Sequence, residues 1–301
     1  MTFSSLMPDL NGREITVDYA LKNVSRTLGP QIAQLTESQL LLPRFFRPYG
    51  RPVEGGGLLY TTVNASDFYS SDVEERQPGA EFRVVEGVDP DPHLAKVRQW
   101  GGKFKITDEQ IRRNDISYLD QQTTQLANTI ARKLDNHAYQ ILDDSINAII
   151  YSGEGWSKLV IDGPADSITP SSLRPPAHLS QAQLQADLEE LAVIHDLMVV
   201  HPNEAHSLRS AYGDRLDDML TSAGVRMVSN PRVTPGVVWV CAEQQVGTVG
   251  FEDPLTVEVY DDRATRSRWV QGFASPALAL DRPYAAKKIH LLDDMFPPEN
   301  P

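Results

Sequence analysis

The chain has 301 residues and 41% hydrophobic residues, which is enough to bury a core of its own. Its formal net charge of −13 argues against a protein that grips nucleic acid through clustered lysine and arginine. A single cysteine excludes an intrachain disulfide and favours an intracellular folding compartment, and no apolar run approaches the ~18 residues that a membrane span needs.

Residues 1–50 carry too little apolar surface to fold alone, and we interpret them as an arm. Within the arm, 40–49 is both apolar and basic, and no acidic residue lies between Glu37 and Glu54. We therefore expect this segment to lie on a neighbouring copy of the chain, whose carboxylates would pair with its arginines. The alternative is a solvated arm that binds nothing. The residues expected at this contact are Arg44, Phe45, Phe46, Arg47 and Arg51.

Residues 51–105 are typical of an extended hairpin. Two β-rich runs, 58–63 and 81–85, flank a polar centre at 67–79. Two long arms without a core of their own are not a stable free-standing unit. We predict that the two runs pair antiparallel and lie across a neighbouring subunit.

A long helix is the strongest local prediction. A capping box of Thr107 and Gln110 predicts a short helix, and Asn114-Asp115 offers a second N-cap directly after it. From 116 to 150, apolar residues recur at steps of three and four without Gly or Pro, which predicts one continuous amphipathic helix. Its length would be about 50 Å at ~1.5 Å per residue.

The remainder of the sequence predicts an α+β unit. A loop-rich connection covers 151–176, and Leu184, Leu188, Leu191 and Ile194 indicate an amphipathic helix. Further helices are predicted from Pro202 and over 214–223. Short strands are predicted at 197–200, 225–228, 237–242, 246–251, 255–260, 268–273 and 277–280.

No catalytic or metal-binding constellation emerges. His195, His201 and His206 are spaced by six and five residues, which does not place two imidazoles on one helical face. Cys241 lies in an apolar run and is interpreted as inert strand core. We therefore expect no enzyme activity, no metal and no cofactor. Four acidic doublets are interpreted as solvated surface: Asp143-Asp144, Asp217-Asp218, Asp261-Asp262 and Asp293-Asp294.

Several segments together resemble one family. Trp100-Gly-Gly-Lys-Phe-Lys-Ile-Thr-Asp-Glu, leading into 126–135, resembles the start of the spine helix in tailed-phage major capsid proteins of the Hong Kong 97 type. Later segments resemble the family in its own order: Val200-His-Pro, Gly224-Val-Arg-Met-Val, Pro235-Gly, Val246-Gly, Pro254-Leu-Thr-Val-Glu-Val and Ala277-Leu-Ala-Leu-Asp-Arg-Pro. No single motif is diagnostic, whereas the ordered set is fairly specific and spans nearly the whole chain.

The resemblance implies an α+β, Hong Kong 97-like capsid fold. It also implies self-assembly into hexamers and pentamers of an icosahedral shell that encloses double-stranded DNA without sequence-specific binding. The shell would be assembled in the cytoplasm of a bacterial host, with no membrane involved. The implied parts are an N-terminal arm (1–50), an extended loop (51–105), a peripheral domain with the spine helix (106–170), an axial domain (171–254), a peripheral hairpin (255–276), and a final axial strand with the tail (277–301).

Two departures from the family qualify this expectation. Only about 50 residues precede the extended loop, so the scaffolding protein would be a separate chain, beside portal and decoration proteins as further partners. Some members weld subunits by a Lys–Asn isopeptide bond. No Lys lies between Lys22 and Lys96 and no Asn between Asn230 and Asn300, so covalent crosslinking is not expected here.

The turn 261–266 is the second expected contact between subunits. By resemblance it lies where three capsomers meet, and an ordinary solvated hairpin turn is the alternative. Two other functions stay open: an encapsulin-like cargo nanocompartment, which shares the fold, and an α+β hydrolase, against which the empty site search argues. The residues expected at the turn contact are Asp261, Asp262, Arg263 and Arg266.

Overall fold

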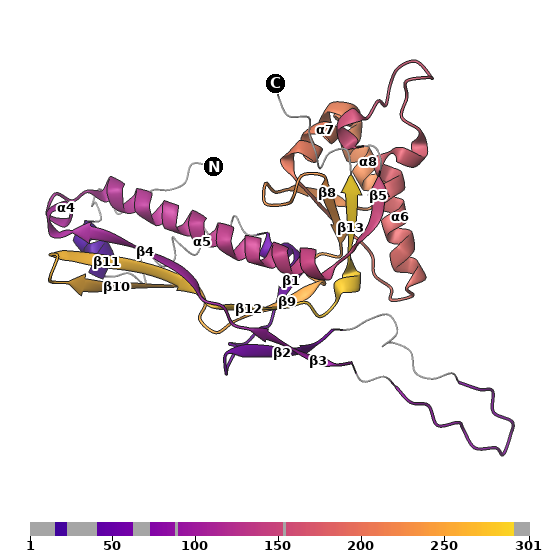
Figure 1. The fold of residues 1–301 in the computed structure, drawn as a ribbon, viewed down its shortest axis with the longest axis horizontal. Helices are drawn as coiled ribbons and strands as arrows, with labels where there is room; N and C mark the ends of the chain where they lie inside the picture. Colours follow the sequence, from indigo (N-terminus) through magenta and orange to yellow (C-terminus); the bar gives the residue numbers. More distant parts are fainter. Residues whose placement is uncertain (1–15, 23–40, 63–72, 88–89, 153–154, 292–301) are drawn as a thin grey trace, which may run out of the picture.

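Helix α5 (Ile116–Ser145) is the longest element and runs from a narrow end of the molecule to a wider upright part (Figure 1). The side chain of Asp115 accepts a hydrogen bond from the N–H of Tyr118, which confirms the second N-cap. The capping box of Thr107 and Gln110 is also confirmed and opens helix α4 (Asp108–Arg112). The structure is a computed structural model, and it describes residues 16–22, 41–62, 73–87, 90–152 and 155–291.

The long helix ends at Ser145, so the predicted end at Ile150 is wrong. Ile146 already has an extended backbone, with φ −111° and ψ 110°. Residues Ala148–Ser152 form strand β5, which pairs in parallel with the last strand, β13 (Ala286–Leu291). β-Branched isoleucines suit a strand, and the sheet offers this segment hydrogen bonds that the local apolar repeat does not reveal.

An antiparallel sheet with the order β10-β11-β4 lies along the narrow half of α5 (Figure 1). One face of this sheet packs against α5 and the short helix α1 (Val17–Lys22) through Phe104 and other apolar side chains. A Cβ atom on Gly102 would lie 2.9 Å from Cδ1 of Leu126, so glycine allows the helix to approach closely. Strands β10 (Thr256–Asp262) and β11 (Ser267–Ala274) confirm two predicted strands, whereas β4 (Trp100–Thr107) was not predicted.

The upright part is built on a five-stranded sheet of order β5-β13-β8-β6-β7. Apolar side chains fill both faces: Trp239 and Leu197 pack toward the end of α5, and Met198 and Val200 pack under the helices. The predicted strands and helices of this region are confirmed as β6 (Leu197–Val200), β7 (Arg226–Ser229), β8 (Val237–Cys241), α7 (Pro202–Tyr212) and α8 (Leu216–Ser222). Short 3-10 turns lie at Trp156–Lys158, Ser171–Leu173, Gly213–Arg215 and Pro283–Ala285.

Helix α6 (Pro175–Leu188) exists, but the predicted apolar stripe does not face the core. The helix buries Leu179, Ala182 and Ala186 instead, and Leu184 and Leu188 are exposed. The chain leaves the helix after Leu188, so Leu191 and Ile194 lie outside it. Small alanines permit close packing on the sheet, and this packing decides which face turns inward.

Strand β13 lies inside the five-stranded sheet although its sequence carries two adjacent lysines. Lys287 is 2% exposed and its ammonium lies 2.6 Å from a carboxylate oxygen of Glu189. Lys288 forms an ion pair with Asp143 at the end of α5. This strand was not among those predicted from the sequence; it pairs in parallel with β5 and antiparallel with β8.

A small sheet of order β1-β9-β12 joins the two halves of the molecule. The strands predicted at 277–280 and 246–251 are both found in this sheet, over 276–279 and 247–251. The helix α3 (Leu42–Phe45) leads directly into β1. The strands are β1 (Phe46–Pro48), β9 (Gly247–Phe251) and β12 (Pro276–Ala279).

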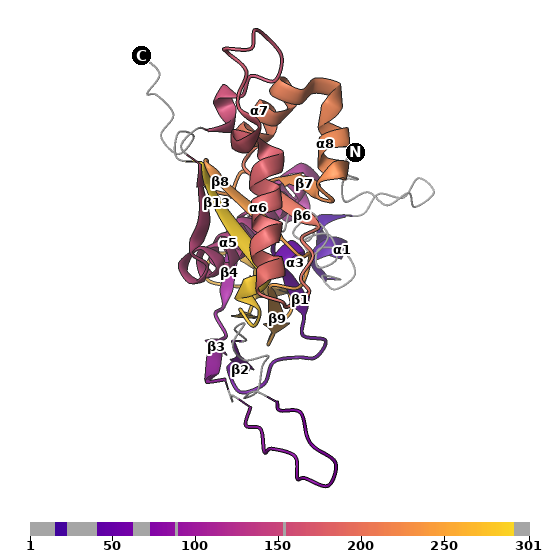
Figure 2. The same cartoon turned by 90° about the vertical axis from the view of Figure 1, so that its right-hand side faces the viewer.

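The extended loop projects from this small sheet, away from both halves (Figures 1 and 2). At its root, β2 (Gly57–Thr61) pairs antiparallel with β3 (Pro92–Lys96), so the predicted pairing of 58–63 with 81–85 is wrong. Residues 81–87 form no strand within the described chain, and Phe82 and Val84 are exposed. Part of the polar centre lies outside the described residues.

Candidate subunit-contact sites

Phe45 and Phe46, expected at a subunit contact, are buried inside their own chain. Each is 1% exposed, and the Phe45 ring packs edge-on against Trp239 with 6.2 Å between the ring centroids. The expectation for these two side chains is wrong, because the five-stranded sheet and α5 already provide an apolar site for them. The apolar and basic character of the segment correctly indicated that it lies on another surface. The local sequence could not tell whether that surface belongs to the same chain or to a neighbour.

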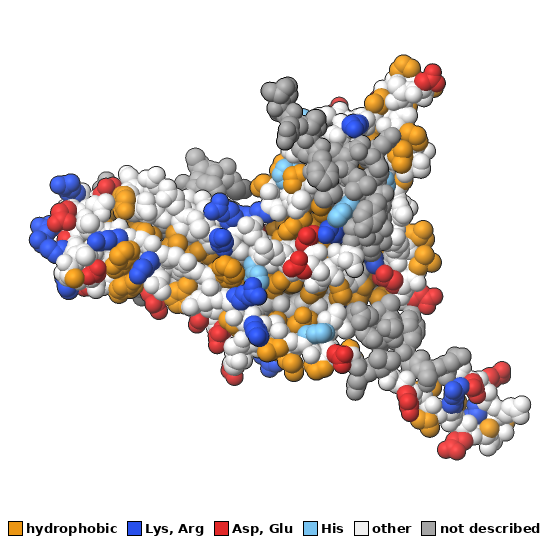
Figure 3. Space-filling view, viewed as in Figure 1, with side chains coloured by type: hydrophobic (Ala, Val, Ile, Leu, Met, Phe, Trp, Pro, Cys, Tyr) orange, Lys and Arg blue, Asp and Glu red, His pale blue; other side chains and the backbone are white. Residues whose placement is uncertain are grey.

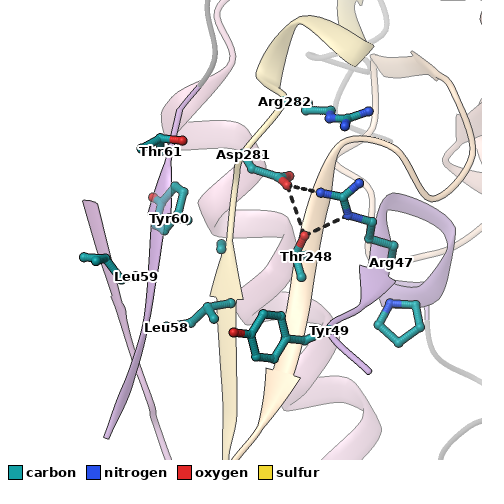
Figure 4. Close-up of a pocket in the computed structure, with 11 residues that line it drawn as sticks. Arg47, Tyr49, Leu58, Leu59, Tyr60, Thr61, Thr248, Asp281 and Arg282 are labelled. Atoms are coloured by element: carbon teal, nitrogen blue, oxygen red, sulfur yellow. Dashed lines mark hydrogen bonds and ion pairs between the residues drawn. The ribbon is translucent and has the colours of Figure 1, made fainter. Parts of the chain in front are cut away.

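Two arginines of this segment also find their acids within the chain, which corrects the expected neighbour pairing. A guanidinium nitrogen of Arg44 lies 2.6 Å from Glu243, and this hydrogen bond holds the pKa of the Glu243 carboxyl below its usual range. Arg47 lies 2.5 Å from Asp281 and donates to the hydroxyl of Thr248 at 3.0 Å (Figure 4).

Arg51 stays exposed and lies over the ring of Tyr49, 4.9 Å from its centroid. Next to it, an open hollow of about 520 Å³ separates the root of the extended loop from β9 and β12 (Figure 4). Leu58 and Tyr60 line its loop side, and the ion pair of Arg47 lines the opposite side. The loop root is held by apolar packing, in which Leu58 and Ala95 lie against Ala277 and Ala279 of β12.

A buried carboxylate on α5 anchors the N-terminal segment. Oδ1 of Asp135 accepts hydrogen bonds from the backbone N–H groups of Leu41 and Leu42, at 2.8 and 3.1 Å. Its Oδ2 lies 2.5 Å from a guanidinium nitrogen of Arg232. Burial raises the pKa of Asp135, against the opposing effects of these three partners. The arm is thus tied to the middle of the long helix by one side chain.

The turn between β10 and β11 holds its acids and projects its arginines. Asp261 accepts from Arg263 at 2.7 Å and from Arg268 at 3.1 Å. Asp262 caps the turn by accepting from the hydroxyl of Thr265, which lowers the pKa of this carboxyl. The side chains of Arg263 and Arg266 are 82% and 68% exposed, so they are available to a neighbouring molecule.

The remaining candidate residues do not form a reactive site. His195 is buried, His201 caps α7 by accepting from the N–H of Asn203, and burial raises the pKa of the Cys241 thiol. Among the described residues, no three His, Cys, Asp or Glu side chains gather as metal ligands. Within the same part of the chain, no helix has the length and apolar character to cross a membrane.

Comparison with known proteins identifies the family. A family model described as phage capsid protein matches residues 91–289. The chain belongs to the phage capsid protein family. Its role is therefore structural, in the capsid of a virion, and it is not an enzyme. The matched region contains α5, the β10-β11-β4 sheet, the five-stranded sheet up to residue 289 of β13, and the turn at Asp261.

Solved structures share the fold at low identity. The capsid of cyanophage P-SCSP1u has a TM-score of 0.60 and 12% identity, over 83% of this chain and 88% of that chain. The capsid of Myoviridae phage XM1 has a TM-score of 0.58 and 10% identity, over 84% and 91%. A virus-like particle from Pyrococcus furiosus has a TM-score of 0.57 and 12% identity, over 87% and 97%. No curated protein matches the sequence significantly.

Proposed function

We propose that this capsid protein is the major capsid protein of a tailed phage and has the Hong Kong 97 type of fold. Copies of the chain assemble as hexamers and pentamers into an icosahedral shell that encloses double-stranded DNA. Family membership and the ordered sequence resemblance support the proposal. In this assignment α5 is the spine helix, the β10-β11-β4 sheet completes the peripheral domain, and the five-stranded sheet is the axial domain.

The extended loop is the observation that carries the proposal. Phe82 is 71% exposed and Val84 is 84% exposed, on a segment that projects away from the rest of the chain (Figure 1). Apolar side chains held out in this way indicate a partner surface. A neighbouring copy supplies that surface in a shell, so the loop lies across the next subunit and is covered there.

Deletion of residues 67–79 tests this role. Among the deleted residues, those that the structure describes, 73–79, belong to none of the apolar cores, so the shortened subunit keeps its circular dichroism spectrum and its unfolding midpoint. It loses the ability to form particles, as seen by sedimentation and negative-stain microscopy. The double variant Phe82→Ser with Val84→Ser gives the same loss, whereas the control Glu74→Gln with Glu75→Gln assembles. Normal assembly of the deletion variant would contradict the proposal.

Further parts of the proposal follow from the turn and from the sequence. Arg263 and Arg266 meet acids of neighbouring copies around a symmetry axis, where a weak exposed pair is repeated many times. The shell is held without covalent crosslinks and is built in the host cytoplasm. A separate scaffolding protein, a portal and decoration proteins are its partners.

A cargo compartment is the second candidate function. The fold is also that of a virus-like particle from Pyrococcus furiosus, matched over 97% of that chain, so the fold alone does not separate a phage capsid from a shell of another kind. The nucleic-acid content of native particles separates the two candidates. A phage capsid contains double-stranded DNA, as read from absorbance at 260 nm and from nuclease-protected DNA on a gel. Particles that hold protein and no DNA would favour the compartment.

A further inference from the structure

Helix α6 carries an exposed apolar patch, which we name the α6 patch and define as Leu184, Leu188 and Ile194. These side chains are 55%, 74% and 75% exposed. Leu184 and Leu188 are one helical turn apart and share a face. Gln183 accepts from the N–H of His195 and donates to the carbonyl of Val193, which brings Ile194 beside the helix.

The segment that carries the α6 patch is acidic, and Lys287 beside it is buried and already paired with Glu189. Residues 175–196 contain no lysine or arginine, whereas Asp187, Glu189 and Glu190 lie at the end of the helix. A surface that covers this patch must therefore be apolar and should bring a cation. The same charges disfavour contact between two α6 patches across a twofold axis, because acids would face acids.

The root of the extended loop carries a second patch with matching properties, which we name the hairpin-root patch. Leu59 and Leu94 are paired across β2 and β3 and are 70% and 58% exposed. A Cβ atom on Gly57 would lie 2.8 Å from Cδ1 of Leu94, so glycine leaves room for this side chain. Lys96 alternates onto the same face and is exposed. Two leucines and a lysine thus complement an acid-rimmed apolar patch.

Other exposed apolar residues fit the α6 patch less well. On the extended loop, Arg76 already lies over the Phe82 ring, 4.6 Å from its centroid, and Arg83 is already paired with Glu74 at 2.6 Å. On the β10-β11-β4 sheet, the ammonium of Lys103 already lies over the ring of Trp269, 4.7 Å from its centroid. This lysine is therefore already engaged and is a poorer partner for the acids of α6. Figure 3 shows hydrophobic side chains reaching the surface both on the projecting loop and on the upright part.

We propose that the α6 patch of one copy docks on the hairpin-root patch of the next copy within a capsomer, an inference that rests on the proposed function. Two different patches that meet head to tail form a heterologous contact, and such contacts close into rings. The contact would cover both leucine pairs and would place Lys96 beside the acids of α6. It is separate from the contact made by the projecting tip of the loop.

Cysteine pairs test the contact, because the natural Cys241 is fully buried and gives no background. Particles of the double variant Leu59→Cys with Leu188→Cys are oxidised with copper phenanthroline and run on a non-reducing detergent gel. We expect a ladder of multimers that dithiothreitol removes. Each single variant, and the control pair Leu59→Cys with Tyr260→Cys, gives only the monomer band.

Two results would overturn the proposal. Assembled particles of the double variant that yield only monomer would show that the patches do not meet. Dimers from Leu188→Cys alone would show that α6 meets its own copy. Wild-type particles provide a measurement without any variant. A carbodiimide should join Lys96 to Asp187 or Glu190 of another copy, read by mass spectrometry, and absence of that linkage counts against the contact. Failure of the wild-type chain to form particles even when the other capsid proteins are present would instead refute the proposed function.

Discussion

Replacing Asp135 by alanine should release the N-terminal segment from the long helix and destabilise the subunit. The carboxylate is fully buried and holds three partners: the N–H groups of Leu41 and Leu42 and the guanidinium of Arg232. Alanine leaves the two N–H groups without their acceptor and removes the charge that balances Arg232. Breaking a buried ion pair from one side costs about 3–5 kcal/mol.

The assay is urea unfolding of the unassembled subunit, followed by tryptophan fluorescence. Trp239 is a suitable reporter because Phe45, which follows the anchored segment, packs against its ring. We expect Asp135→Ala to lose about 3–5 kcal/mol of unfolding free energy. The matched control is Asp144→Ala, the same change at an exposed position of the same helix, with an effect within about 0.5 kcal/mol. Equal stability of the two variants would refute the view that Asp135 anchors the arm.

Three further outcomes follow from the described residues and from the sequence. Burial lowers the pKa of His195 to about 4 from an ordinary 6.5, so its contribution to the unfolding free energy is fully present above pH 6.5 and falls by about 3 kcal/mol as the pH drops to 4. The variant His195→Leu should weaken this decline, measured as the urea midpoint at each pH, and an unchanged slope would exclude His195 as its cause. Particles boiled in detergent with reductant should give one band near 33.5 kDa, and a surviving ladder would reveal a covalent crosslink. Arg263→Glu with Arg266→Glu should leave a folded subunit and prevent shell closure, and particles as salt-resistant as wild type would make the turn an ordinary one.

Local rules predicted the elements whose stability is local. The capping box at Thr107 and the N-cap at Asp115 are interactions among residues three apart, and both are present as predicted. The apolar repeat gave the long helix for the same reason, because residues three and four apart share one face. The strands with turn residues between them were also found, because a short apolar run bounded by turn residues is a local signal. This holds for strands that are buried throughout, as β6 and β8 are.

Long-range partners account for what the sequence did not reveal. Lys287 and Lys288 resemble surface residues until Glu189 and Asp143, far away in the chain, neutralise them inside the sheet. The face of α6 that turns inward was likewise decided by packing. Of the expected contact residues, Phe45 proved to be core, whereas the exposed arginines of the turn remain candidates.

Cryo-electron microscopy of particles formed by the purified chain tests the central claim most directly. The account predicts closed icosahedral shells made of rings of six and five copies, with each extended loop lying across a neighbouring subunit. The density should also show α6 of one copy beside the β2–β3 hairpin of the next. A chain that stays monomeric or forms small open oligomers, with or without the other capsid proteins, would contradict the account.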